Sequence, residues 1–146
     1  MPAIKMDKMS KTYRGKKGRQ IEALHDLSLE INQGEVFGFL GPNGAGKSTT
    51  IKLLMGMVKP SSGSATICGV PVALPNSRQN VGYLPENPSF YDFLTAREYL
   101  QFVGRSFGLS KSDVAKESEG VLRLMGLDAA ADRPVKGYSK GMVQRL

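Results

Sequence analysis

A nine-residue segment, Gly41–Thr49, constrains the fold of this 146-residue chain more than any other stretch. It fits the pattern G-x-x-x-x-G-K-[ST] of a phosphate-binding loop. Glycines let such a backbone curl so that successive N–H groups face one concavity, and the helix that follows adds the positive end of its dipole. The segment therefore predicts a site for a nucleoside triphosphate. Its residues are Gly41, Pro42, Asn43, Gly44, Ala45, Gly46, Lys47, Ser48 and Thr49.

The two polar side chains at the end of this loop have separate expected roles. The Lys47 ammonium would reach the β- and γ-phosphates, and the Ser48 hydroxyl would ligate Mg²⁺. The alternative is a glycine-rich turn before a helix that carries Lys-Ser by chance. Context favours the phosphate loop, because the apolar run 36–40 predicts a buried parallel strand before it. Apolar residues at helical spacing predict a helix after it, which would end at Lys59-Pro60.

Length and composition indicate one domain of ordinary size, with room for a hydrophobic core. No run approaches the roughly 18 apolar residues of a membrane span, and the charged N-terminus does not resemble a signal peptide. We therefore expect a soluble cytoplasmic protein. The single cysteine, Cys68, fits a reducing compartment, and its strand-like surroundings predict a buried packing role.

The formal net charge of +7 is concentrated in the first 20 residues, which carry seven basic side chains against Asp7. Such a patch can contact nucleic acid or an anionic membrane surface. The alternative is a solvated hairpin whose tip is 15–18. We favour the hairpin, because no aromatic residues interleave with the basic ones to stack on bases.

The periodicity of the sequence divides the chain into three parts. Alternating apolar residues predict an antiparallel sheet in 1–33. The phosphate loop lies in a core, 34–93, that includes a further predicted strand at 81–84. Cap signals predict helices in 94–146, beginning at Thr95, at Ser110 and after Ser139.

Five stretches together resemble the ATP-binding cassette family, the nucleotide-binding subunits of ABC transporters. The resemblance covers essentially the whole chain. It implies an α/β P-loop NTPase fold with an N-terminal antiparallel β subdomain, a helical insertion and an incomplete core sheet, so that 1–146 is a single partial domain. The stretches are Tyr13, Gly41–Thr49, Val81–Glu86, Phe90–Glu98 and Tyr138–Met142.

The resemblance assigns further binding residues. Tyr13 matches the aromatic residue that stacks on adenine, which makes ATP the expected nucleotide, although a tyrosine between two strands can also simply pack. Ser139 and Gly141 match the signature motif, which faces the γ-phosphate held by a second copy of the domain. The expected assembly is a head-to-tail homodimer or heterodimer. Ser139 can serve as an ordinary helix N-cap at the same time.

This sequence departs from the family pattern within two motifs. Glu86 stands where the family has the glutamine of the Q-loop, which contacts Mg²⁺ and links ATP to the membrane partner. A carboxylate can still ligate Mg²⁺, but it adds negative charge beside the γ-phosphate. In the signature, Lys140 and Met142 replace a glycine and a glutamine, whereas Ser139 and Gly141 are retained.

The implied function is an energy-coupling subunit that binds and hydrolyses ATP to drive a transmembrane permease. It would lie in the cytoplasm, held at the inner face of the membrane by that permease, with 86–93 as the docking segment. The alternatives are a soluble ABC-type ATPase acting on nucleic acid or the ribosome, an unrelated phosphate-loop enzyme, and an inert fragment. We do not expect nucleic acid as a partner.

In the family, the Walker B strand, catalytic glutamate, D-loop and switch histidine follow the signature helix, and these 146 residues include none of them. Among the present residues, Lys47 would stabilise transition-state charge. The general base that activates water is missing. We therefore expect an N-terminal fragment that is hydrolysis-incompetent alone and exposes apolar surface.

ATP turnover by the 146-residue chain should accordingly be indistinguishable from buffer in a phosphate-release assay. Clear hydrolysis that Lys47→Ala abolishes would show that the missing segments are not required.

Overall fold

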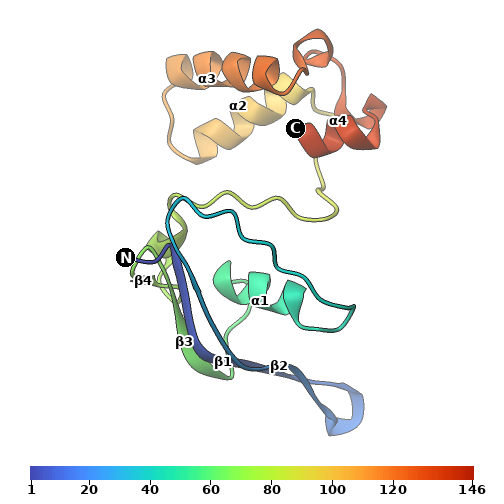
Figure 1. Cartoon of the computed structure of the whole chain (residues 1–146). Coiled ribbons are helices and arrows are strands. Elements are labelled where there is room, and N and C mark those ends of the chain that lie inside the picture. The colour runs from blue at the N-terminus through green and yellow to red at the C-terminus, as the bar shows by residue number, and fades with distance from the viewer. The chain divides into compact units, whose positions relative to one another are not determined.

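A computed structural model describes the backbone of residues 1–146 and every side chain except that of Lys16. The chain divides into two compact units, Met1–Gly82 and Tyr83–Leu146, which are described separately. The first unit is a sheet with one α-helix, and the second is helical (Figure 1). The subdivisions 1–33, 34–93 and 94–146 remain predictions.

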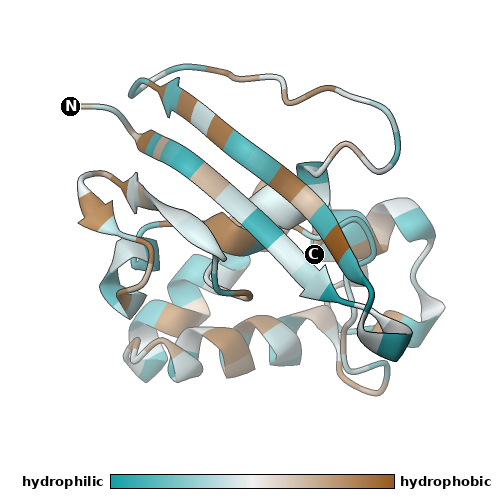
Figure 2. Ribbon diagram, turned by 90° about the horizontal axis from the view of Figure 1, so that it is seen from below, coloured by the Kyte–Doolittle hydropathy of each residue, from teal (hydrophilic) through white to brown (hydrophobic). Residues whose placement is uncertain are grey.

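The sheet of the first unit is antiparallel throughout, with strand order β2-β1-β3-β4. The predicted antiparallel piece is therefore present, and hydropathy varies along its two long strands (Figure 2). A short helical turn, η1 (Lys16–Gly18), forms the hairpin tip, where Lys17 and Gly18 are exposed. The strands are β1 (Ile4–Arg14), β2 (Gln20–Ile31), β3 (Ser62–Ile67) and β4 (Val70–Pro71).

Two irregular positions, one on each strand, bend the β1–β2 hairpin. Lys8 and Asp26 have φ angles of 44° and 41°, which are unusual for residues other than glycine. At each position the hydroxyl of a serine on the opposite strand accepts a hydrogen bond from the displaced backbone N–H. Ser28 Oγ accepts from Lys8 N at 3.0 Å, and Ser10 Oγ accepts from Asp26 N at 2.9 Å. The hydroxyls therefore satisfy donors that the irregular ladder leaves free.

The turn between β3 and β4 corrects the prediction for Cys68. Ile67 pairs with Val70, so Cys68 and Gly69 form a two-residue hairpin loop, with φ angles of 47° and 77°. Such loops need positive φ at both central residues. Cys68 is consequently exposed at a turn rather than buried in a strand.

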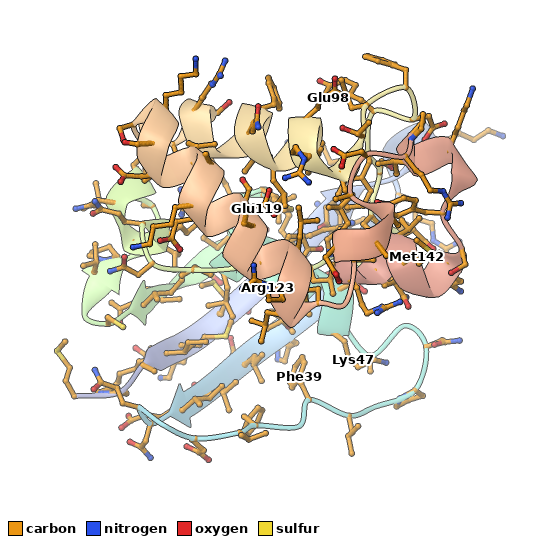
Figure 3. The ribbon with its side chains drawn as sticks, turned by 90° about the horizontal axis from the view of Figure 1, so that it is seen from above. Phe39, Lys47, Glu98, Glu119, Arg123 and Met142 are labelled. Carbon is orange, nitrogen blue, oxygen red and sulfur yellow. The ribbon has the colours of Figure 1, made fainter. Side chains whose placement is uncertain are left out.

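Helix α1 (Lys47–Leu54) begins directly at the end of the phosphate loop, where Lys47 is labelled in Figure 3. It ends earlier than the predicted stop at Lys59-Pro60, because Gly56 adopts φ +65°. Gly56 N donates to Leu53 O at 3.0 Å, and Met57 N donates to Lys52 O at 2.9 Å. These two bonds form a Schellman cap, so the glycine was the sequence signal for the true end.

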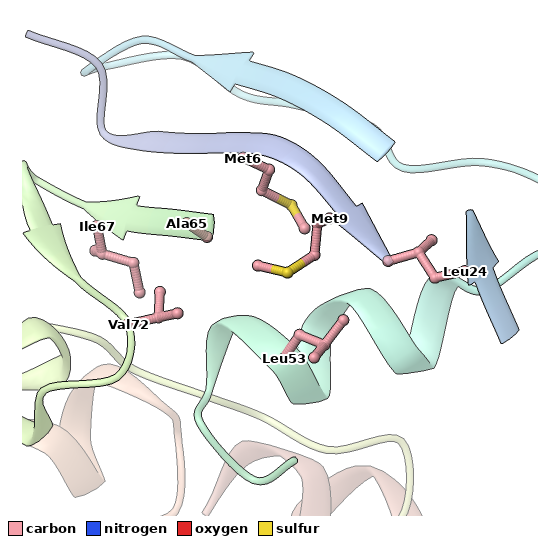
Figure 4. Close-up of a cluster of buried hydrophobic side chains, with 7 residues drawn as sticks. All are labelled: Met6, Met9, Leu24, Leu53, Ala65, Ile67 and Val72. Atoms are coloured by element: carbon pink, nitrogen blue, oxygen red, sulfur yellow. The ribbon is translucent and has the colours of Figure 1, made fainter. Parts of the chain in front are cut away.

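One face of this helix packs against the core of the first unit, to which it contributes Leu53 (Figure 4). Leu53 is wholly buried against side chains of the sheet. Truncating such a leucine typically lowers the free energy of unfolding by about 2–5 kcal/mol. The other buried members are Met6, Met9, Leu24, Ala65, Ile67 and Val72.

Two predicted strands are not formed. Residues 36–40 and 81–84 have no regular secondary structure, and Leu40 is 91 % exposed. A strand needs a neighbouring strand to take its backbone hydrogen bonds, and within the described residues none pairs with either run. The apolar pattern of these two runs was therefore not sufficient to predict a strand. Pro75–Arg78 forms a short 3-10 helix, η2.

The second unit contains α2 (Ala96–Ser106), α3 (Lys111–Leu124) and α4 (Lys140–Arg145). Two short 3-10 turns, η3 (Asp128–Ala130) and η4 (Val135–Gly137), lie between the last two helices. The predicted capping box is present, because Thr95 and Glu98 bond reciprocally. Ser110 caps α3 as predicted. In the part of the chain that the structure describes, no helix is long and apolar enough to cross a membrane.

Arg97 connects three segments of this unit. Its guanidinium pairs with Glu119 on α3 and with Asp132 after η3, where Nε donates to Oδ1 at 2.7 Å. The hydrogen bond from Arg97 lowers the pKa of Asp132, and Thr95 lowers the pKa of Glu98 in the same way. A small core lies beside these pairs, made of Ala96, Leu122, Leu127 and Ala131.

The two glycines in the second half of the phosphate loop form a matched pair for a stability test. Gly44 and Gly46 have nearly equal φ angles, +86° and +88°. A Cβ on Gly46 would lie 2.7 Å from Ala23 O, whereas a Cβ on Gly44 would meet nothing within 4 Å. We expect Gly44→Ala to cost about 1–2 kcal/mol of unfolding free energy, the strain of left-handed backbone alone.

Gly46→Ala should cost more, about 3–4 kcal/mol, because the backbones of the loop and of β2 must also separate. Urea unfolding followed by circular dichroism measures both variants. Equal losses would show that the loop does not depend on this contact.

Candidate functional site

The start of α1 is suited to hold an anion. The first intrahelical bond runs from Thr50 N to Gly46 O at 2.8 Å, so the N–H groups of Lys47, Ser48 and Thr49 have no acceptor within the helix. Among the described residues, no side chain caps this end and no acidic residue lies in its first turn. These donors and the positive end of the helix dipole are therefore available to phosphate oxygens.

The Lys47 side chain folds over the beginning of the same loop. Its ammonium donates to Gly41 O at 2.5 Å and to Pro42 O at 2.8 Å. Both acceptors are neutral carbonyls. A charged phosphate oxygen is a stronger acceptor than a carbonyl, so phosphate can replace them. The loop thus combines one mobile cation with several fixed backbone donors, which fits a triphosphate.

The loop is held against the N-terminal hairpin. Gly46 lies so close to β2 that its Cα faces the carbonyl of Ala23 and the side chain of Leu24. Leu24 is itself buried in the core under α1. The loop therefore has a fixed position on the sheet, although much of it is exposed.

Tyr13 lies on the same stretch of this hairpin. It pairs with Ile21, and Lys11 pairs with Leu24, so Ala23 falls between the two pairs. The structure therefore places Tyr13 and the end of the phosphate loop along one short part of the β1–β2 hairpin. Tyr13 is half-buried and lies near the Lys11 ammonium.

The predicted metal ligands belong to different units. Ser48 lies in the first unit, whereas Glu86 lies in an exposed loop of the second. Because the units are described separately, joint coordination of Mg²⁺ by these residues remains a prediction. Within the described residues, no group of three or more His, Cys, Asp or Glu side chains could hold a metal ion.

The signature residues lie at the start of α4. Ser139 is its N-cap, and Ser139 Oγ accepts a hydrogen bond from Met142 N at 3.3 Å. The N-cap interpretation is therefore satisfied, and the hydroxyl proton is left to donate elsewhere. Gly141 is exposed in the first turn, as is Lys140.

Side chains on both sides of the signature attach it to the segment after α3. Tyr138 Oη donates to Ala130 O at 2.7 Å, and burial raises the pKa of Tyr138, so the hydroxyl stays protonated as a donor. Arg145 donates through one terminal nitrogen to Met125 O at 2.8 Å and through Nε to Gly141 O at 3.2 Å. Met125 is the C-cap of α3. The signature is therefore anchored from two directions.

Sequence reasoning missed two features of the site. One is the contact of Lys11 with Tyr13, which their i, i+2 spacing on a strand could have suggested. The other is Phe102, which joins Tyr91 and Phe93 in an exposed cluster, here called the aromatic face. The Tyr91 ring centroid lies 5.8 Å from that of Phe93 and 5.9 Å from that of Phe102. Part of this cluster lies in the predicted docking segment 86–93.

Comparison with known proteins gives consistent matches. The sequence profile of the family described as "ABC transporter" matches residues 24–146. An uncharacterized ABC transporter ATP-binding protein, sll0415, from Synechocystis sp. is 43 % identical over 142 residues, which are 94 % of this chain and 40 % of that protein. The chain thus spans less than half the length of this relative.

Two solved structures have the same fold. One, described as the structure of the ATP binding subunit of an ABC transporter, is 31 % identical with a TM-score of 0.81, over 98 % of this chain and 58 % of that one. The other, described as the dimeric structure of MJ0796, a bacterial ABC transporter cassette, is 25 % identical with a TM-score of 0.84, over 97 % and 66 %. The predicted P-loop NTPase fold is confirmed, and the chain belongs to the ABC transporter family.

Proposed function

We propose that this chain supplies the ATP-binding part of a transporter subunit that couples ATP binding and hydrolysis to movement of a substrate across a membrane. The observation that carries the proposal is the uncapped start of α1 with Lys47, which follows the contact of Gly46 with Ala23 on the hairpin that also carries Tyr13. A basic, donor-rich end and an aromatic ring on one short surface match the two ends of ATP. Family membership supports the same function.

In this proposal the nucleotide is bound by its two ends. The adenine ring stacks on Tyr13, and the phosphates accept from the N–H groups of Gly44–Thr49. Lys47 exchanges the carbonyls of Gly41 and Pro42 for β- and γ-phosphate oxygens. Ser48 and Glu86 are the residues that would hold Mg²⁺, which neutralises charge on those oxygens.

A second ABC domain completes the site in trans. Ser139 accepts from Met142 N, so its hydroxyl proton can donate to a γ-phosphate bound by the other copy. Gly141 has no side chain that would obstruct close approach of a phosphate. The MJ0796 cassette, which shares this fold, is described as dimeric. We therefore propose a head-to-tail dimer in which each phosphate loop faces the other subunit's signature.

This arrangement predicts complementation between two defective variants of the full-length protein. Lys47→Ala should lose ATP-driven dimerisation, and Ser139→Ala should weaken it at least tenfold, a loss of about 1.4 kcal/mol for a hydrogen bond to a charged group. In a 1:1 mixture, a heterodimer regains one intact composite site. Analytical ultracentrifugation with ATP and Mg²⁺ should detect dimers that neither variant forms well alone.

Ser110→Ala is the matched control, because Ser110 is also a serine N-cap in the same unit, accepting from Asp113 N at 3.2 Å. It should alter helix stability without altering ATP-driven dimerisation. If the fraction of dimer in the mixture of Lys47→Ala and Ser139→Ala is only the average of the fractions that the two variants form alone, the proposed composite site is wrong.

We further propose that the aromatic face binds the transmembrane permease. Tyr91, Phe93 and Phe102 are 52 %, 74 % and 51 % exposed, and the Tyr91 ring meets Phe93 in a tilted arrangement and Phe102 edge to face. Large aromatic side chains left exposed in a contiguous group are typical of protein interfaces. The position of Tyr91 and Phe93 next to the Q-loop motif supports a membrane subunit as the partner.

Phe93→Asp should remove co-purification with the transmembrane permease, because a carboxylate would be desolvated in the interface. ATP affinity should stay within about twofold of the wild type. Phe107→Asp is the control, since Phe107 is 82 % exposed at the end of α2 and lies outside the aromatic face. Loss of the permease from both variants alike would contradict a specific docking role.

A further inference from the structure

We propose that Lys11 is a positioning residue of the nucleotide site, which holds the ring of Tyr13 as a platform for the adenine base. This inference rests on the proposed binding of ATP by Tyr13 and the phosphate loop. It assigns to a residue of the basic hairpin a role that neither the motif pattern nor the charge count indicated.

The contacts of the Lys11 side chain carry the proposal. Its Nζ lies over the Tyr13 ring, 5.0 Å from the ring centroid, within the range of a cation–π interaction. The same Nζ donates to Lys59 O at 2.7 Å. The hydrogen bond to the Lys59 carbonyl thus fixes the ammonium at its position over the Tyr13 ring. Among the side chains that the structure describes, no carboxylate forms an ion pair with Lys11.

The Lys59 carbonyl is itself part of a seam between β1 and the turn that follows α1. Ser61 N donates to Ser10 O at 2.9 Å, and Thr12 N donates to Ser61 Oγ at 2.9 Å. With the Lys11 bond, three hydrogen bonds join residues 10–12 to 59–61. This seam links the strand that carries Tyr13 to the chain leaving the phosphate-loop helix.

The physical consequence is preorganisation of the base platform. A tyrosine ring on a surface strand can rotate about two side-chain torsions, and a base that stacks on it must first restrict that motion. The ammonium engages one face of the ring and limits its rotation, while an aromatic ring offers its second face to adenine. Lys11 would therefore favour binding of the base without contacting the phosphates.

The test compares two ligands on the full-length protein with Mg²⁺ at about 0.15 M salt, where screening acts over roughly 8 Å. Lys11→Met keeps an unbranched apolar stem and removes the ammonium. It should weaken ATP binding about two- to fivefold, the range expected for an exposed cation–π contact. The affinity for inorganic triphosphate, which has no base, should not change. Isothermal titration calorimetry measures both affinities.

Lys5→Met is the matched control, because it makes the same charge change on the same strand at an exposed pair with Glu30. It should leave the ratio of ATP to triphosphate affinity at the wild-type value. Lys11→Arg should retain most of the ATP affinity, since a guanidinium can replace both contacts. In a Tyr13→Ala background, Lys11→Met should have no further effect on ATP binding.

Two results would overturn the assignment: an equal loss of ATP and triphosphate affinity in Lys11→Met, or an undiminished effect of that change when Tyr13 is already absent. Failure of the proposed function has a different signature. If Lys47→Ala leaves triphosphate affinity unchanged, the phosphate loop is not the site, whatever Lys11 does.

Discussion

The close approach of Gly46 to the Ala23 carbonyl is the contact on which the rest of the site depends. Because Gly46 has no Cβ and adopts φ +88°, the phosphate loop can lie directly on β2 before α1 begins. That position places the residue before the uncapped helix end on the same short part of the hairpin as Tyr13. It also aims Leu53 into the core of the sheet. One backbone contact therefore positions both the loop of the proposed site and the helix that packs on the core.

The second unit supplies the other half of the proposed composite site. Tyr138, just before its signature serine, donates to Ala130 in η3, and Arg145 at the end of α4 donates to Met125 at the end of α3. A motif that acts on another subunit's nucleotide must be held rigidly by its own subunit. The aromatic face beside the Q-loop motif belongs to this same unit. Proposed contacts with the second ABC domain and with the permease therefore involve one small helical body.

Local signals in the sequence predicted local structure well. The capping box of Thr95 and Glu98 formed as expected, because its two hydrogen bonds lie within four residues. The strand predictions for 36–40 and 81–84 were wrong, because a strand depends on a partner that local pattern does not provide. Cys68 was misplaced for a related reason. Its hydrophobic neighbours suggested a strand, whereas the pairing of Ile67 with Val70 required a turn there.

The sequence by itself predicted the residues of the proposed site: a phosphate loop with Lys47 and Ser48, an aromatic residue at Tyr13, and a signature at Ser139 and Gly141. The phosphate loop follows from its own motif, whereas Tyr13, Ser139 and Gly141 follow from the resemblance to the ABC family. Only the tertiary structure decided what supports them. The contact of Gly46 with Ala23 and of Lys11 with Tyr13 and Lys59 joins residues from different elements. Such contacts depend on strand register and helix packing, which no local pattern encodes.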